Sequence, residues 1–318
     1  MTDAALGYAF AISALVLFSA SILVTKMATG GMPLSLGFLI STVVNVVFAG
    51  LLFLFQLAWR TEALVWNTQA FLLFTAAGLF ATYLGRWFFY ESVVRFGPSK
   101  ASIFQVSSPL FTALMAWLFL GERLSLLVFA GMAMAIGGLM LVSYKPGPSP
   151  TVGAGTPPAP PLAQGLIGRL QQQVLQSVLL LGLSGSLAYA VGNVLRGLAV
   201  RSWPEPILGA LLGAALGLAL HLGFSRDKNG LLARLRGADR TCAGLFALVG
   251  VTTIAAQMLV IAAMRYIPLS VVTLVTLCTP LFVFPVSAIV FKAKGDFNLN
   301  TLAGSALALT GIAIVVMR

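Results

Sequence analysis

Long runs of hydrophobic residues, separated by short polar breaks, extend along almost the whole chain. A helix needs about 20 apolar residues to cross the hydrocarbon core of a bilayer. Some breaks carry turn residues, as at Gly97-Pro98, where a helix is expected to end. The pattern predicts ten transmembrane helices, at residues 5–26, 33–55, 69–93, 99–120, 124–143, 174–197, 204–224, 241–263, 268–291 and 299–317.

One segment in the middle of the chain differs in composition from the rest. Residues 145–164 hold seven of the fifteen prolines, and such a segment can neither form a helix nor bury a core. We interpret residues 145–170 as an exposed linker. It separates a first unit, residues 1–144, from a second unit, residues 171–318, and each unit contains five of the predicted helices.

The two units share short motifs in the same order, at offsets of 170 to 173 residues. Such self-similarity indicates an internal repeat. Because five is an odd number, the second copy enters the membrane from the opposite side, which is a recurrent plan of secondary transporters. The sequence therefore predicts an all-α membrane protein built from two inverted-topology repeats of five helices. The matches are Arg95-Phe96-Gly97-Pro98 with Arg265-Tyr266-Ile267-Pro268, Ser108-Pro109-Leu110-Phe111 with Thr279-Pro280-Leu281-Phe282, and Gly131 and Gly138 with Gly304 and Gly311.

The composition supports a lipid environment and excludes several function classes. Hydrophobic residues make up 59% of the chain and charged residues only 8%, and the net charge is +11. The basic residues lie mostly in short loops, so we expect contact with the lipid bilayer and not with nucleic acid. One histidine, His221, and two cysteines, Cys242 and Cys278, provide neither a metal site nor a disulfide framework. We expect no cofactor, no metal and no catalytic residues, since an intramembrane enzyme needs a cluster of such groups.

The charged residue that is most costly to place in the membrane is Arg86, which lies well inside the third predicted helix. A charge at this depth is a functional hypothesis by default. Tyr83, Arg86 and Tyr90 share one helical face, which could bind a carboxylate or phosphate and stack an apolar group. The alternative is that Arg86 reaches the headgroups or pairs with Glu91.

Two polar stripes correspond to each other under the repeat and predict the lining of a central cavity. The alternative for each hydroxyl is a bond to its own helix backbone or to a neighbouring helix. A proline directly follows each stripe, where it would act as a gating hinge or as a static kink. The stripes are Ser102, Gln105 and Ser108 in helix four and Thr273, Thr276 and Thr279 in helix nine, with Pro109 and Pro280 as the hinge candidates.

Polar residues of the second unit complete the predicted pathway. Tyr189 and Asn193 share one face of helix six with Arg196, and Gln257 lies inside helix eight. Asn193 could bind solute or instead form an interhelical hydrogen bond. The glycines of helix seven, at 209, 213 and 217, allow a neighbouring helix to approach closely. Packing within the chain explains them, so we expect a monomer, with a dimer as the alternative.

The stretch 107–143 resembles the most recognisable part of the EamA domain, from the drug/metabolite transporter superfamily. The resemblance rests on Pro109-Leu110-Phe111, Gly121-Glu122-Arg123 and the glycine-spaced helix that follows. The second unit keeps Pro280-Leu281-Phe282 but departs from the Gly-Glu motif at residues 291–300. The resemblance implies a ten-helix carrier of the bacterial inner membrane that works by alternating access and often exports amino acids or other metabolites.

These observations together predict a secondary transporter that exports a small amino-acid-like, zwitterionic or anionic solute. An exporter of drugs or of lipid- or nucleotide-linked solutes is the alternative within transport, and a channel or membrane scaffold is the alternative outside it. No acid follows Asp3 in the first helix, which argues against the glutamate-based antiport of small multidrug transporters. The resemblance places both termini in the cytoplasm, whereas the distribution of Lys and Arg favours the opposite orientation.

Overall fold

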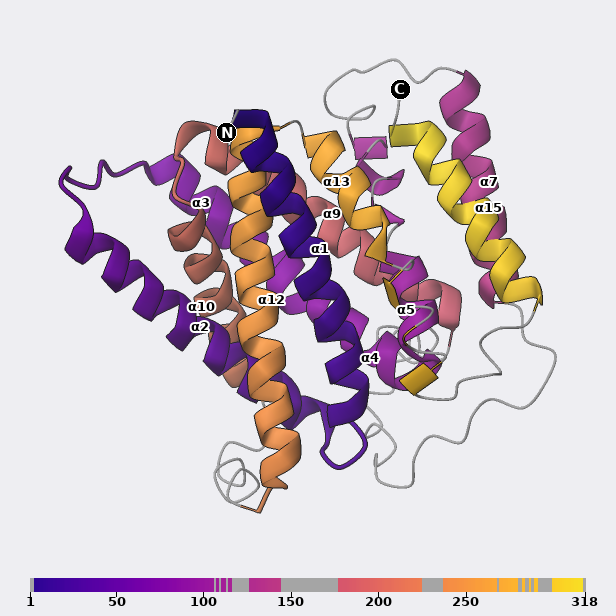
Figure 1. Ribbon diagram of the computed structural model, residues 1–318, viewed down its shortest axis with the longest axis horizontal. Coiled ribbons are helices and arrows are strands. Elements are labelled where there is room, and N and C mark those ends of the chain that lie inside the picture. Colours follow the sequence, from indigo (N-terminus) through magenta and orange to yellow (C-terminus); the bar gives the residue numbers. More distant parts are fainter. Residues whose placement is uncertain are drawn as a thin grey trace.

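In the computed structural model, all regular secondary structure in the described part of the chain is helical (Figure 1). That part comprises residues 3–105, 107–108, 110–112, 114–115, 126–143, 177–224, 237–267, 269–279, 282–283, 286, 289–290 and 299–316. Its helices are α1 (Asp3–Ala28), α2 (Leu34–Trp59), α3 (Thr68–Ala77), the π-helix η1 (Gly78–Gly85), α4 (Arg86–Phe96), α5 (Pro98–Gln105), α7 (Leu126–Ser143), α9 (Val178–Ser202), α10 (Pro206–Phe224), α12 (Arg240–Tyr266), α13 (Leu269–Leu277) and α15 (Leu299–Val316).

Six helical segments within these residues are long and apolar enough to cross a membrane. One of them, Thr68–Phe96, joins α3, η1 and α4 into a single continuous helix. The predicted class, an all-α membrane protein, is therefore confirmed. The shorter α5 and α13 begin the predicted fourth and ninth helices, and the count of ten remains a prediction.

Side-chain caps fix where several helices begin. The Asn67 side chain accepts a hydrogen bond from the backbone N–H of Ala70 at 3.0 Å, and Ser177 accepts one from Leu180 at 3.2 Å. Asp239 caps α12 in the same way. Each cap satisfies a backbone donor that the first turn of a helix leaves free. At the other end of the third helix, Gly97 adopts φ 88°, which favours glycine, and terminates α4 before Pro98.

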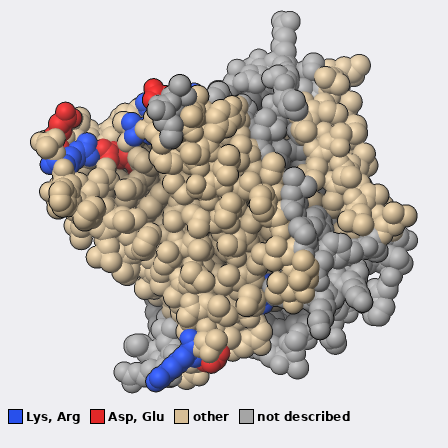
Figure 2. Space-filling model, viewed as in Figure 1, with Lys and Arg blue, Asp and Glu red and all other residues tan. Residues whose placement is uncertain are grey.

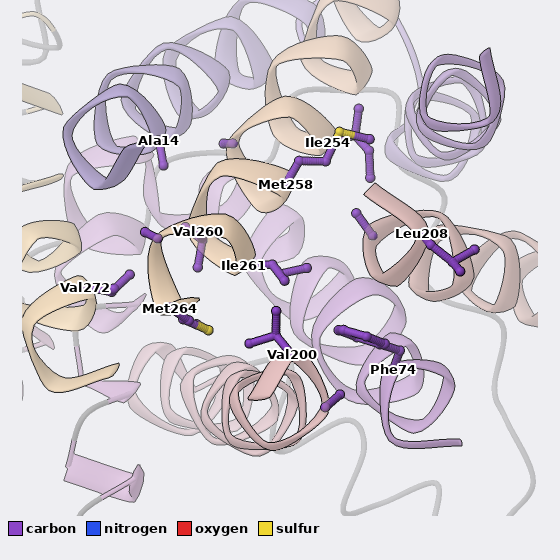
Figure 3. Packing of buried hydrophobic residues seen from close by; sticks show 14 of the residues in the cluster. Ala14, Phe74, Val200, Leu208, Ile254, Met258, Val260, Ile261, Met264 and Val272 are labelled. Carbon is purple, nitrogen blue, oxygen red and sulfur yellow. The ribbon is translucent and has the colours of Figure 1, made fainter. Parts of the chain in front are cut away.

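The halves of the chain interleave, since the third helix of each half packs on the first two helices of the other. In the first half, α3, η1 and α4 pack against α9, and α3 and η1 against α10. In the second half, α12 packs against α1 and α2. Figure 3 shows the resulting core, in which Met258 and Ile261 of α12 lie among Ala14, Val200 and other residues of α1, α3, α9, α10 and α13.

Two glycine–phenylalanine contacts show the same exchange at residue level. Gly209 of α10 lies so close to Phe74 of α3 that a Cβ atom on it would come within 2.5 Å of the ring. Gly37 of α2 lies equally tightly against Phe246 of α12. Gly209 lies 172 positions after Gly37, and Phe246 lies 172 positions after Phe74. The contacts are thus related by the repeat.

The last helices of the two halves, α7 and α15, lie side by side at one edge of the molecule (Figure 1). Gly131 faces Gly311, where a Cβ atom on Gly131 would lie 2.8 Å from the partner carbonyl oxygen. Gly138 faces Gly304 in the same way at 2.5 Å. The order of these pairs makes the two helices antiparallel, as an inverted repeat requires. The division into residues 1–144, 145–170 and 171–318 stays a prediction, since the linker lies outside the described residues.

The charged residues visible on the face in Figure 2 gather at its two ends, with a broad band of uncharged side chains between them. Large apolar residues of α2, including Leu51, Leu54 and Phe55, are exposed within the described part of the chain. Exposed apolar surface of this extent fits a protein that is surrounded by lipid.

Candidate solute-binding site

Arg86 begins α4 in the middle of the third helix, and its side chain is only 1% exposed. Its partner is Asn45 of α2, which is fully buried. In one orientation of the Asn45 amide, both its oxygen and its nitrogen have hydrogen-bond partners. In this orientation the oxygen accepts from both terminal nitrogens of Arg86, with Nη2 at 3.0 Å. Arg86 therefore neither reaches the headgroups nor pairs with Glu91, which instead binds Arg95 at 2.8 Å.

The same Asn45 amide connects the two halves. Its nitrogen donates to the carbonyl oxygen of Ser41 at 3.0 Å and to that of Gly250 in α12 at 2.6 Å. Tyr90 donates from its hydroxyl to the Ser41 side chain at 3.4 Å. The position of Arg86 is thus coupled to a backbone carbonyl of the second half.

Arg196 of α9 is a second buried arginine, 3% exposed. Its Nη2 donates to the hydroxyl of Thr82 in η1 at 3.1 Å and to Oε1 of Gln257 in α12 at 3.0 Å. Arg196 also interacts electrostatically with Arg86, so the two guanidinium groups belong to one cluster. We call Arg86, Arg196, Asn45, Thr82 and Gln257 the arginine cluster.

The partners of the arginine cluster are all neutral. Within the described residues neither Arg86 nor Arg196 forms a salt bridge. The buried acid Glu205 pairs with Arg60 at 2.6 Å near the start of α10. A bound anion would stabilise two buried positive charges whose hydrogen-bond acceptors are all neutral.

Tyr189 stands between the arginine cluster and a small cleft. Its half-buried ring packs on Gly85, where an added Cβ would lie 3.2 Å from ring carbons, and it interacts electrostatically with Arg86 and Arg196. The cleft has about 190 Å³ of empty space, part of it open to the outside. It lies between α4, α5 and α9 and is lined by Phe89, Ser92, Ala101, Phe104, Gln105, Gly182, Gly185, Ser186 and Tyr189.

Aromatic side chains form a wall beside Arg86. Phe38 of α2 packs edge-on against Tyr90, with ring centroids 5.8 Å apart, and against Tyr83 at 6.3 Å. The ring of His221, from the end of α10, lies 4.8 Å from Phe38. The predicted face of Tyr83, Arg86 and Tyr90 therefore meets α2 and not the lipid.

The π-helix η1 compensates for a difference in length between the repeats. Before it, Phe74 corresponds to Phe246, which lies 172 positions later, whereas after it Arg95 corresponds to Arg265, 170 positions later. The first half thus has two additional residues here, and the wider turns of η1 accommodate them while the flanking turns keep their register. Both Thr82 and Gly85 belong to this segment.

The predicted polar stripes have different neighbours in the structure. Gln105 lines the cleft with Tyr189, and Ser108 is buried. Thr276 is half-buried in α13, and the Thr279 hydroxyl donates to the Thr276 carbonyl at 2.7 Å. Because α5 packs mainly on α4 and α9 and α13 mainly on α1, the described contacts do not bring the stripes together. Ser102 and Thr273 lie in helices, but their side chains, like Pro109 and Pro280, lie outside the described residues.

Two other predicted residues of the second half lie near the cluster. Gln257 is 3% exposed and belongs to it, and Asn193 is half-buried on α9 one turn before Arg196. Sequence reasoning did not single out Asn45 or Thr82 as site residues. An amide in the middle of an apolar run was the available signal for Asn45, because such residues in membrane helices usually have a partner.

Comparison with known proteins agrees with this architecture. Residues 5–144 match the EamA-like transporter family. A solved structure described as "Crystal structure of protein" superimposes with a TM-score of 0.57, over 98% of this chain and 96% of that chain, at 16% identity. That likeness shows a shared fold alone. No curated protein matches the chain. The protein is therefore a multi-pass membrane protein whose residues 5–144 match the EamA-like transporter family.

Proposed function

We propose that the protein is a secondary transporter that binds the acidic group of a small anionic or zwitterionic metabolite between Arg86 and Arg196. The observation that carries the proposal is the burial of both guanidinium groups without a carboxylate among the described residues. Burying an ion costs on the order of several kcal/mol even after relaxation. Neutral amide and hydroxyl acceptors offset part of this cost, and a bound anion would offset more.

The cluster lies where the two halves meet, which suits alternating access. Thr82 and Arg86 come from the third helix of the first half, and Arg196 and Gln257 come from the second half. Inverted-repeat carriers bind solute at such an interface and expose it by moving one bundle against the other. A movement that separates α9 from η1 would break the Arg196–Thr82 bond and release the solute.

The cleft between α4, α5 and α9 offers an approach to the arginine cluster. Tyr189 and Gln105 line it, so a solute entering between α4, α5 and α9 would pass Tyr189 to reach the arginines. The resemblance to EamA-domain transporters suggests export across the bacterial inner membrane, and we include both in the proposal.

The test is flux of labelled organic acids and amino acids through proteoliposomes that contain the wild type, Arg86→Gln, Arg196→Gln or Arg201→Gln. Arg201 is exposed at the end of the same α9 helix and serves as the matched control. We expect at least one solute to be carried by the wild type and Arg201→Gln, with a loss of tenfold or more in the other two. Equal flux in all four variants would refute the proposed binding site.

A further inference from the structure

We infer that the solute is a small organic dianion and not a zwitterion. The inference rests on the proposed function and narrows it. It follows from where the negative charges of the chain lie relative to Arg86 and Arg196.

None of the described acids pairs with Arg86 or Arg196. Glu91 pairs with Arg95 at 2.8 Å, and Glu205 pairs with Arg60 at 2.6 Å. The remaining three described acids are exposed: Asp3, Glu62 and Asp239. The arginine cluster thus carries two positive charges that no described carboxylate balances. A monoanion would neutralise one of them, whereas a dianion neutralises both.

An ammonium group would have to share its acceptors with the arginines. The neutral side-chain oxygens of the cluster already accept from a guanidinium group: Asn45 Oδ1 from Arg86, and Thr82 Oγ1 and Gln257 Oε1 from Arg196. An amino acid would therefore place its ammonium near two like charges at a depth where repulsion is poorly screened. The site favours a second acidic group in that position.

The test uses three four-carbon acids that differ only in their second end group: succinate, butyrate and 4-aminobutyrate. Thermal unfolding of the full-length protein in detergent at low ionic strength measures their binding, with glycerol 3-phosphate as a second dianion. We expect one or both dianions to raise Tm, butyrate to act more weakly and 4-aminobutyrate to have no effect. Arg86→Gln and Arg196→Gln should each abolish the difference between succinate and butyrate.

Gln257→Glu provides a variant that retains the side-chain shape. It adds one negative charge beside Arg196, so the preference should change from succinate to butyrate. Stabilisation by 4-aminobutyrate equal to that by succinate, or no stabilisation by either dianion, overturns the inference. In either case, arginine-dependent flux of any other solute would leave the proposed transport function intact, and only its absence would refute both.

Discussion

Arg196 donates a hydrogen bond from Nη2 to the hydroxyl of Thr82 at 3.1 Å, and this bond joins the first helix of the second half to the π-helix of the first half. Because both residues are buried, Thr82→Val would leave part of the guanidinium unsatisfied in a low-dielectric environment. We expect a loss of about 2 kcal/mol in stability, measured as a lower midpoint of thermal or denaturant unfolding in detergent.

Thr75→Val is the control for this substitution on the same continuous helix. The Thr75 hydroxyl donates to the backbone carbonyl of Phe71 at 2.8 Å, so its removal leaves no buried charge without a partner. We expect a change well below that of Thr82→Val. Equal effects of the two substitutions would show that the Arg196–Thr82 bond contributes nothing specific.

Alanine substitutions at two adjacent glycines of α7 should have different effects on the stability of the protein. A Cβ atom on Gly138 would lie 2.5 Å from the Gly304 carbonyl oxygen, whereas one on Gly137 meets nothing within 4 Å. Gly138→Ala should therefore cost about 1–3 kcal/mol through overpacking against α15. Gly137→Ala should be neutral or stabilise by up to about 1 kcal/mol, since alanine favours the helix. Thermal unfolding of both variants measures the difference, and a harmless Gly138→Ala would contradict the α7–α15 contact.

The π-helix predicts an unusual pattern of deletion effects. Removing one residue from η1, either Phe80 or Leu84, should turn the flanking helical segments out of register and reduce the folded fraction. Removing both should restore the spacing found in the second half and recover folded protein. Size-exclusion profiles of the detergent-solubilised variants measure the folded fraction. A double deletion that folds worse than both single deletions would show that η1 does not accommodate two extra residues.

Asp239, which precedes α12, predicts a pH dependence of stability. The Cys242 thiol, followed by the backbone N–H groups of Cys242 and Thr241, hydrogen-bonds its carboxylate and lowers the pKa of Asp239. A lowered pKa in the folded state means that the stabilisation is present above the ordinary value of about 4 and is lost as the pH falls through the folded-state pKa. Asp239→Asn should therefore lower Tm at pH 7, and the difference from the wild type should shrink on acidification below about pH 4. A difference that stays constant with pH would exclude this origin.

The apolar pattern was sufficient to predict the helices and their class, because a lipid environment leaves few other solutions. The predicted helix boundaries differ from the observed ones next to the candidate site. The sixth helix was predicted to end at residue 197, which placed Arg196 at the membrane edge, but α9 continues to Ser202 and buries it. The stop signal is the sequence Arg201-Ser202-Trp203-Pro204, which follows the last apolar residues.

The burial of Arg86 could be expected from its depth, but its partner could not. Asn45 lies on a different helix, and its amide reaches Arg86 only because Gly250 of α12 lies close to α2 and its carbonyl anchors the amide nitrogen. Helix periodicity describes the faces of single helices and does not specify which faces meet. The same limit applies to the polar stripes around Gln105 and Thr276. They correspond to each other under the internal repeat, but the cavity that they would share remains a prediction.

The central claim is that Arg86 and Arg196 together bind the transported anion. Phenylglyoxal modifies arginine side chains, and peptide mass spectrometry quantifies the modification at each arginine of the protein in proteoliposomes. With succinate as the first probe, followed by any other solute found to be transported, we expect protection of Arg86 and Arg196 and none of the exposed Arg201. Modification of Arg86 and Arg196 at rates that a transported solute does not change would contradict the account.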